Sequence, residues 1–426
     1  MPSLVIPLAA VVAAAPGSGV DIEAAVQAAL ARAPALAAQA KSEAVAAART
    51  EAARSAYLPR LSFEASYLAR APVNNLPIEL PALPGLEPIP NVDDVHHVQV
   101  GLTAGYRVLD LGRGHRVQAA QAAEQAEAAT TEARRADLAF AVRGTFLAAL
   151  YAQEVRDIAS ASVKLAQQQL RRAELRAQAG VSGDVAVAQA RVRVASLQAQ
   201  QRRAESELDR HRHRLASFLG QESLPSLAGS LESMGGPVEH GDLLAHPEVR
   251  RLAALERASV ELATGRKRDF IPTLSVMGSA KLQYPRALKL ELGPVYEAGI
   301  SLAWPLFDGF LRASEVQVHE AQAEALARMS DAQLEALRRD IIDVQARENT
   351  VQAELQSAEQ TLVQTQVYLR VARAALEAGA GTELDVHTAE LGLDQAKMAK
   401  KKALFERALL GAEALRIHGR VLGGRS

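Results

Sequence analysis

Few side chains in this sequence have the spacing that catalysis or metal binding needs. His96 and His97 are adjacent, and His211 and His213 are two residues apart. Two ligands on one helical face stand about four residues apart, so neither pair predicts a metal site. The chain has no cysteine, and it shows no nucleophile elbow, phosphate loop or catalytic carboxylate pair. We therefore expect a non-enzymatic chain without a metal or a cofactor.

Two aspartates follow short glycine-rich segments, AGVSGDV and AGAGTELDV, that interrupt long helical patterns. Gly180 and Gly379 suit the left-handed position that ends a helix. Asp184 and Asp385 then have two compatible interpretations: they are N-caps of the returning helices, or they act at functional tips. In both interpretations, each aspartate marks the turn of a helical hairpin.

Long helices position these tips. Residues 115–179 and 311–378 contain no proline and predict helices of roughly 100 Å each. In the second of them, apolar residues recur at alternating spacings of three and four from Leu334 to Leu376, which is typical of a coiled-coil seam. Shorter helices are expected at 22–54, which Pro34 kinks or interrupts, and at 185–219, 247–269 and 384–415.

The segment GISLAWPLFDGF at 299–310 joins an alternating strand pattern to a long helix, and GLTAGYRVLDLG at 101–112 repeats this joint. Pro305 ends the strand, and Asp308 is expected to be the N-cap of the helix that follows. Four segments alternate apolar and polar side chains over about ten residues, the length of a tilted transmembrane strand. Their apolar residues include Leu61, Phe63, Tyr67, Val98, Val100, Leu102, Leu274, Val276, Leu282, Tyr296, Ile300 and Leu302.

Aromatic residues lie near the ends of these segments and resemble the girdle that contacts the lipid interface of a membrane barrel. They are Tyr57, Tyr67, Tyr106, Tyr284, Tyr296 and Trp304. The alternative is a half-buried sheet of a soluble protein, because alternation alone is a weak signal. An open sheet edge is forbidden in lipid, so four membrane strands predict an oligomer.

Composition narrows the class of protein. The chain has 48 basic and 49 acidic residues and a formal net charge of -1, so it lacks the basic surface of a nucleic-acid-binding protein. No apolar run after the first residues is long enough for a transmembrane helix. Aromatic residues make up only 4% of the chain, which favours long helices over a thick globular core. We expect a mainly α fold with a small β part.

The chain divides into two similar halves. YLPRLSF at 57–63 corresponds to FIPTLSV at 270–276, which predicts an internal repeat of roughly 200 residues. We place the first repeat at 18–221, an inter-repeat equatorial segment at 222–245, the second repeat at 246–418 and a short C-terminal tail at 419–426. Residues 1–17 are an expected signal segment, which is atypical because its basic n-region is missing.

These motifs resemble the outer-membrane efflux protein family, the TolC-like channel-tunnels. The resemblance rests on DIEAAVQAALARAPAL, on YLPRLSF and FIPTLSV, on LAWPLFDGF, and on the two glycine tips that are each followed by Asp-Val. It implies a homotrimer in the cell outer membrane, in which four β-strands per subunit complete a twelve-stranded β-barrel. It also implies that the coiled-coil helices continue this barrel as an α-barrel in the periplasm.

The resemblance further implies roles for the tip residues. A periplasmic membrane-fusion adaptor would dock on the tips, and the adaptor would itself bind an inner-membrane transporter of the RND or ABC type. The docking residues would be Ala179, Gly180, Val181, Ser182, Ala378, Gly379, Ala380 and Gly381. Asp385 matches one position of an acidic ring at the periplasmic entrance, whereas the second acidic position falls on Thr388. Asp184 matches an aspartate that clasps the closed entrance, but Gly381 occupies the place of its arginine partner.

The function implied by the resemblance is a passive exit duct for small molecules or drugs within a tripartite efflux system. A type I protein secretion system uses the same kind of duct, and the sequence does not separate these two functions. An alternative of another class is a periplasmic coiled-coil scaffold without a pore. That alternative requires the four alternating segments to be soluble.

Overall fold

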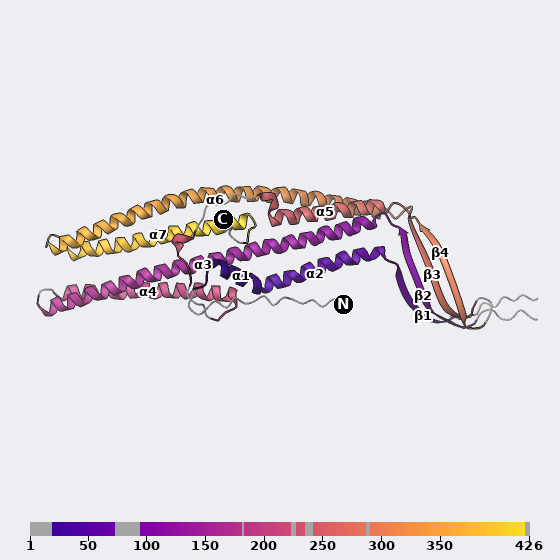
Figure 1. Cartoon of the computed structure of the whole chain (residues 1–426), viewed down its shortest axis with the longest axis horizontal. Coiled ribbons are helices and arrows are strands. Elements are labelled where there is room, and N and C mark those ends of the chain that lie inside the picture. The colour runs from indigo at the N-terminus through magenta and orange to yellow at the C-terminus, as the bar shows by residue number, and fades with distance from the viewer. Residues whose placement is uncertain are drawn as a thin grey trace, which may run out of the picture. The chain divides into compact units, whose positions relative to one another are not determined.

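The computed structural model describes residues 19–72, 94–180, 183–222, 227–234, 242–286 and 290–421 (Figure 1). These residues form long helices and one four-stranded antiparallel sheet, which confirms the expected fold class. The expected signal segment, the tip residues Val181 and Ser182 and the end of the C-terminal tail lie outside the described residues. Within the described ranges, no helix is both long enough and apolar enough to cross a membrane.

The order of the elements repeats: in each half, helix precedes two strands, and a long helix and a shorter returning helix follow them. The first half contains α1 (Ile22–Arg32), α2 (Pro34–Arg54), β1 (Arg60–Ala69), β2 (His96–Leu109), α3 (Arg113–Gln178) and α4 (Asp184–Leu219). The second half contains α5 (Pro247–Arg268), β3 (Thr273–Tyr284), β4 (Gly293–Ala303), α6 (Leu311–Glu377) and α7 (Glu383–Ile417). Both long helices were predicted to within two residues at either end.

The chain divides into two compact units. One unit comprises Met1–Lys41, Ala129–Arg250 and Asp331–Ser426 and holds both helical hairpin tips. The other comprises Ser42–Ala128 and Arg251–Ser330 and holds the sheet. The helices α2, α3, α5 and α6 contribute residues to both units.

The predicted seam of α6 supplies part of the core of the first unit. Leu337, Val344 and Val351 are buried against Leu410 and Ile417 of α7. Nearer the tips, Leu369 and Ala372 pack against Val386 and Ala389, and the two helices lie side by side (Figure 1). Burial of each large aliphatic side chain contributes about 1.5–3 kcal/mol, so this seam holds the hairpin together.

The helices end where the sequence predicts. Gly180 and Gly379 both have a φ angle of +72°, the left-handed conformation in which glycine has no steric cost. Of the two effects expected at Pro34, a kink or an interruption, the structure has the interruption, since α1 ends at Arg32 and α2 begins at Pro34. Proline is favoured at the first position of a helix, where its missing N–H has no intrahelical partner.

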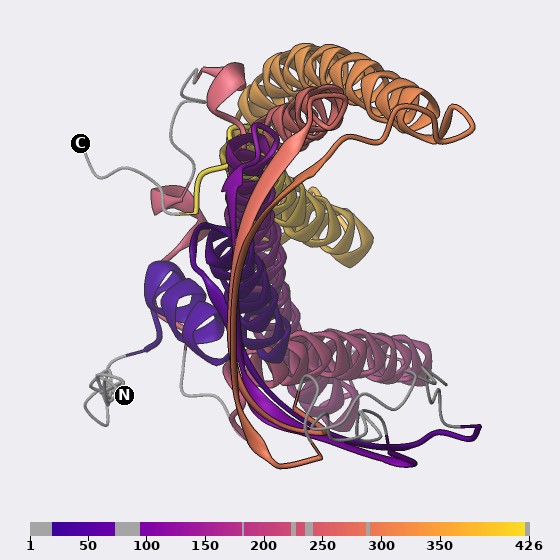
Figure 2. The ribbon, with the colours of Figure 1, turned by 90° about the vertical axis from the view of Figure 1, so that its right-hand side faces the viewer.

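The sheet has the strand order β1-β2-β3-β4, with β1 and β4 as its edges. Consecutive strands pair antiparallel, and the sheet is visibly curved (Figure 2). A β-bulge interrupts the register between β2 and β3 after Arg107. Such bulges increase strand twist, in keeping with a curved sheet.

Gly101 is a position at which the sheet has no room for a side chain. It pairs with Lys281, and a Cβ atom there would lie 2.4 Å from the carbonyl oxygen of Ala280 and 2.7 Å from Cγ of Lys281. The first of these contacts involves backbone, which does not move away as a flexible side chain does. Only glycine therefore allows β2 to approach β3 this closely.

We expect Gly101→Ala to weaken the pairing of β2 with β3 and to destabilise the protein by about 1–3 kcal/mol, the usual cost of overpacking. Gly105→Ala is the matched control, because Gly105 lies on the same strand and a Cβ atom there meets nothing within 4 Å. Thermal unfolding followed by circular dichroism compares the two variants. Equal melting temperatures would mean that the strands shift to accommodate the added methyl group.

Candidate functional site

The strand register separates apolar from polar side chains. Paired residues point to the same face of a sheet, and successive residues point to opposite faces. One face, here called the apolar face, collects Leu61, Phe63, Ala65, Tyr67, Val98, Val100, Leu102, Ala104, Tyr106, Val276, Ala280, Leu282, Tyr296, Ala298, Ile300 and Leu302. The opposite face, the polar face, collects Arg60, Ser62, Glu64, Ser66, Gln99, Thr103, Arg107, Ser275, Ser279, Lys281, Gln283, Glu297 and Ser301.

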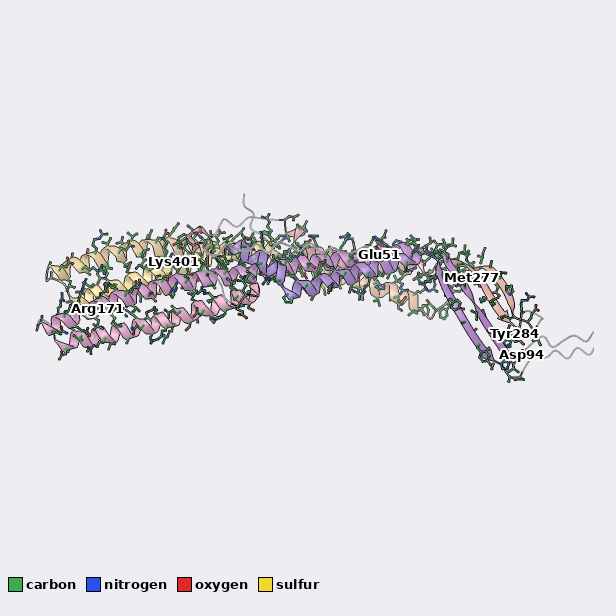
Figure 3. The ribbon with its side chains drawn as sticks, turned by 60° about the horizontal axis from the view of Figure 1, so that its bottom comes forward. Glu51, Asp94, Arg171, Met277, Tyr284 and Lys401 are labelled. Carbon is green, nitrogen blue, oxygen red and sulfur yellow. The ribbon has the colours of Figure 1, made fainter. Side chains whose placement is uncertain are left out.

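The apolar face is open in the single chain. Tyr296 is 77% exposed and Ile300 75% exposed, values that are unusual for side chains of this size. Met277, labelled in Figure 3, interrupts the polar face, whereas the apolar face carries no charged side chain in the paired rows. A surface of this kind needs an apolar environment to cover it.

The predicted aromatic residues gather mainly at the two ends of the sheet. At one end, the Tyr284 hydroxyl donates to Asp94 at 2.6 Å (Figure 3), and the Tyr67 hydroxyl lies 2.7 Å from Nδ1 of His96. The helix-side end carries Tyr57, Tyr106 and Trp304, whereas Tyr296 pairs with Ala280 farther inside the sheet. Their role at a lipid interface stays a prediction.

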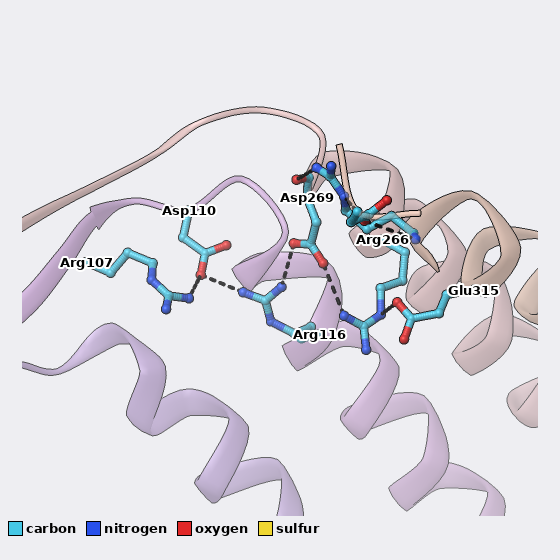
Figure 4. A network of polar contacts seen from close by, with 8 residues as sticks. Arg107, Asp110, Arg116, Arg266, Asp269 and Glu315 are labelled. Carbon is cyan, nitrogen blue, oxygen red and sulfur yellow. Dashed lines mark hydrogen bonds and ion pairs between the residues drawn. The ribbon is translucent and has the colours of Figure 1, made fainter. Parts of the chain in front are cut away.

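An ion-pair network joins the ends of the strands to the helices. It runs from Arg107 through Asp110, Arg116, Asp269 and Arg266 to Glu315, with distances of 2.5–3.4 Å (Figure 4). Asp110 is almost completely buried and accepts from both Arg107 and Arg116. The network links β2 to α3, and α3 to α5 and α6.

Asp308 is not the N-cap that the sequence predicts. Helix α6 begins at Leu311, three positions later, and Asp308 instead accepts from the backbone N–H and the Nε of Arg312. The prediction was wrong because Gly309 and Phe310 both adopt positive φ angles, which add a turn before the helix. The aspartate still satisfies a backbone donor of the first helical turn.

Two arginines that the sequence analysis missed build this joint in both halves of the chain. The Arg113 guanidinium lies over the ring of Tyr57, and the Arg312 guanidinium lies over the ring of Phe270, 4.7 Å from its centroid. Tyr57 and Phe270 are the first residues of the repeated motifs YLPRLSF and FIPTLSV. The repeat itself was the signal that could have identified both arginines.

The tip residues that the structure describes are small and accessible. Ala179 and Gly180 end the α3 side of one hairpin, and Ala378, Gly379 and Ala380 end the α6 side of the other. Gly381 is partly buried, and a Cβ atom there would lie 3.0 Å from Cβ of Ala375. Nothing in the structure tests the docking role of these residues.

Neither predicted entrance aspartate is an N-cap, so that interpretation was wrong. Thr382 caps α7, and Asp385 is the third residue of the helix, where its carboxylate accepts from the Thr382 hydroxyl and backbone N–H. These two hydrogen bonds lower the pKa of Asp385 below its usual value. Asp184 is the first residue of α4, after Gly183 as N-cap, and the Thr388 hydroxyl donates to the carbonyl of Leu384. All three side chains are exposed.

Glu390 of α7 is a buried carboxylate shared by four helices, and the sequence analysis missed it. Its side chain is only 4% exposed and accepts from Gln169 of α3 at 3.0 Å, Arg193 of α4 at 2.8 Å and Arg373 of α6 at 3.1 Å. Burial alone would raise the pKa of Glu390, but these hydrogen bonds outweigh burial and hold the pKa below its ordinary value. We call these four residues the Glu390 cluster.

The Glu390 cluster ties one helical hairpin to the other near their tips. It connects α3 and α4 to α6 and α7, and an ion pair of 2.9 Å between Arg176 and Glu383 adds a second link. The Arg176 pair is exposed and contributes little, whereas the side chains of Glu390 and Arg193 are only 4% and 21% exposed. Of these two links, the Glu390 cluster is therefore the stronger one.

We see no grouping that suggests catalysis among the residues that the structure describes. In the ranges that the structure describes, no three His, Asp or Glu side chains gather closely enough to hold a metal ion. The main features of the structure are an amphipathic sheet, an ion-pair network between strands and helices, and two helical hairpins linked near their tips.

We compared the chain with protein families, curated proteins and solved structures. The profile of the outer membrane efflux protein family matches residues 25–221 and 242–413. A search of curated proteins found no match. Among solved structures, the chain is similar to the outer membrane protein VceC from Vibrio cholerae, with 17% identity and a TM-score of 0.75, covering 94% of this chain and 97% of that one.

Two further channel structures share the fold. CusC, whose structures concern folding and transmembrane channel formation, aligns at 17% identity with a TM-score of 0.79 over 96% of both chains. The outer membrane channel CmeC from Campylobacter jejuni aligns at 16% identity with a TM-score of 0.76, covering 95% of this chain and 87% of that chain. The family profile covers most of the sequence, and the fold agrees with it. The chain therefore belongs to the outer membrane efflux protein family and is a protein of the cell outer membrane.

Proposed function

We propose that this chain forms a passive outer-membrane duct that works as a homotrimer in a tripartite efflux system. The strand register is the observation that carries the proposal, because it collects apolar side chains on one face of the sheet and polar side chains on the other. A barrel wall between lipid and a water-filled lumen needs this separation. The apolar face would contact lipid, and the polar face would line the lumen.

The edges of the sheet support a closed assembly of several copies. Strands β1 and β4 each have one unpaired side, and lipid does not tolerate unpaired backbone groups. The two edges run antiparallel, so β4 of one copy can pair with β1 of the next. Two copies would give a barrel of eight strands, whose interior side chains fill, and three copies are the smallest number that leaves an aqueous lumen.

The helical tips suit the periplasmic entrance of such a duct. Accessible small residues such as Gly180 and Gly379 allow the helices of an adaptor to approach the backbone closely. The adaptor would connect the duct to an inner-membrane pump, which supplies the energy, and the cargo would be small molecules or drugs. The Glu390 cluster would hold the entrance closed by keeping the two hairpins together.

Single-channel recording of the purified protein in a planar bilayer, with crosslinking to count subunits, tests this function. We expect discrete conductance steps from crosslinked trimers. Asp385→Asn is the informative variant, because asparagine can still accept from Thr382 while the charge is removed. A unit charge at about 4 Å is worth about 1 kcal/mol in water, so we expect roughly fivefold lower preference for cations at low salt.

Asp331→Asn is the matched control, since Asp331 is exposed on α6 and distant in sequence from the tips. The control should keep the ion preference of the wild type. Folded protein that fails to insert or conduct would refute the duct and favour a periplasmic scaffold. A normal ion preference in Asp385→Asn would refute only the role of Asp385 at the constriction.

A further inference from the structure

The end of α7 and the start of α5 pack tightly against each other. Val249 of α5 is buried in one apolar cluster with Ile417 of α7. Gly419 follows α7 with a φ angle of +64°, and a Cβ atom there would lie 3.0 Å from Cγ of Pro247 and closer still to its Cδ. Only glycine therefore lets the chain approach the first residue of α5 this closely. We call these four residues the α5–α7 joint.

His246 directly precedes α5 and caps its first turn. Its Nδ1 accepts from the backbone N–H of Glu248 at 3.2 Å, and its carbonyl oxygen accepts from the backbone N–H of Arg250 at 3.0 Å. Serine, threonine, aspartate and asparagine are the usual N-caps, and a histidine can replace them only while Nδ1 carries a lone pair. The cap therefore requires the neutral form of His246, with its proton on Nε2.

Protonation of His246 removes the cap, and no rotation of the ring restores it. Both nitrogens of an imidazolium are donors, so neither can accept from the backbone N–H of Glu248. The added positive charge would also lie at the end of α5 where the helix dipole is positive. The lost hydrogen bond and this repulsion both destabilise the first turn of α5.

Charged and titratable side chains from three helices face His246. Arg416 and His418, at the end of α7, oppose its protonation. Glu248 of α5 and Asp137 of α3 favour its protonation. Burial has the largest effect, and the pKa of His246 is lowered below its ordinary value. The folded cap thus binds a proton less readily than a frayed one, so it is fully stable above about pH 6.5 and loses stability as the pH falls below that value.

We propose that His246 makes the α5–α7 joint an acid-sensitive switch, which holds the first turn of α5 at neutral pH and releases it when His246 is protonated. This inference is independent of the proposed duct, because all of the contacts that carry it lie within one unit of the chain. That unit contains residues 247–250, whereas the rest of α5 belongs to the unit that holds the sheet. Acid therefore loosens the end of a helix that contributes residues to both units.

Hydrogen exchange of the full-length protein in detergent, measured by mass spectrometry, tests the switch. The protein is compared at about pH 7.5 and about pH 5, on either side of the ordinary histidine pKa of about 6.5. The rates are corrected for the pH dependence of intrinsic amide exchange. We expect a peptide that covers residues 244–254 to exchange roughly fivefold faster at the acid pH, the change that loss of an N-cap produces.

His246→Asn is the decisive variant, because asparagine is a strong N-cap that does not titrate, and we expect it to exchange equally fast at both pH values. His418→Asn is the matched control, since it removes a second histidine that faces the cap but leaves the cap in place, so the pH dependence should persist. Wild-type protein that exchanges equally fast at both pH values would overturn the proposal. A pH dependence that survives in His246→Asn, or that disappears only in His418→Asn, would overturn it as well.

Discussion

In the proposed duct, replacing Glu390 with glutamine is expected to keep the channel open for most of a single-channel recording, whereas we expect the wild type to open rarely. The substitution conserves shape but leaves Arg193 and Arg373 without the carboxylate that both contact. Removing one partner of a buried ion pair costs about 3 kcal/mol, which corresponds to a roughly hundredfold shift in the ratio of closed to open states. The two guanidinium groups would also repel each other and separate the hairpins.

Glu335→Gln is the matched control for this experiment. Glu335 also pairs with an arginine, Arg338, but both side chains are more than half exposed. An exposed pair contributes at most about 1 kcal/mol, so the control should behave as the wild type. If intact Glu390→Gln trimers open no more often than the wild type, the Glu390 cluster does not hold the entrance closed.

The sequence predicted the elements that depend on local spacing. The three- and four-residue spacing from Leu334 to Leu376 fixed the buried side of α6, and Gly180 and Gly379 marked both helix ends. The alternation of apolar and polar residues predicted the four strands and the division of the sheet into an apolar and a polar face. Each of these features follows from periodicity or backbone preference within one segment.

Some of the features that the sequence missed depend on contacts between segments, and others on local turn geometry. Glu390 meets donors from three other helices, and the alignment of the two hairpins with each other is not encoded in the pattern of either. Asp385 was predicted to be the N-cap of α7, but Thr382, three residues earlier, occupies that position. Asp308 was misplaced for a similar reason, since the left-handed turn at Phe310 delays the start of α6.

Replacing Arg312 with alanine is expected to open the joint between β4 and α6 locally. Arg312 is 8% exposed and donates to the Asp308 carboxylate and to the carbonyls of Pro305 and Asp269 while stacking on Phe270. A hydrogen bond to a charged group contributes about 1.5–3 kcal/mol, and its loss leaves partly buried acceptors with fewer donors. We expect a total loss of about 3 kcal/mol, which makes local opening roughly a hundredfold more frequent.

Hydrogen exchange followed by mass spectrometry measures how often this joint opens. Peptides that cover residues 305–316 should exchange roughly a hundredfold faster in Arg312→Ala, while peptides from the α6–α7 seam should not change. Arg312→Lys should give an intermediate rate, because lysine keeps the charge but lacks the planar guanidinium group that donates to three acceptors at once. Arg113→Ala should produce the same effect at the first joint, between β2 and α3.

Arg328→Ala is the control on the same helix. Arg328 is 77% exposed, and its nearest carboxylate oxygen, on Glu324, is 3.9 Å away, so its loss should change exchange by less than about fivefold. If Arg312→Ala exchanges no faster than this control, the stacked arginine is not what fixes the strand to the helix. The ion-pair network around Asp110 and Asp269 would then have to supply that rigidity by itself.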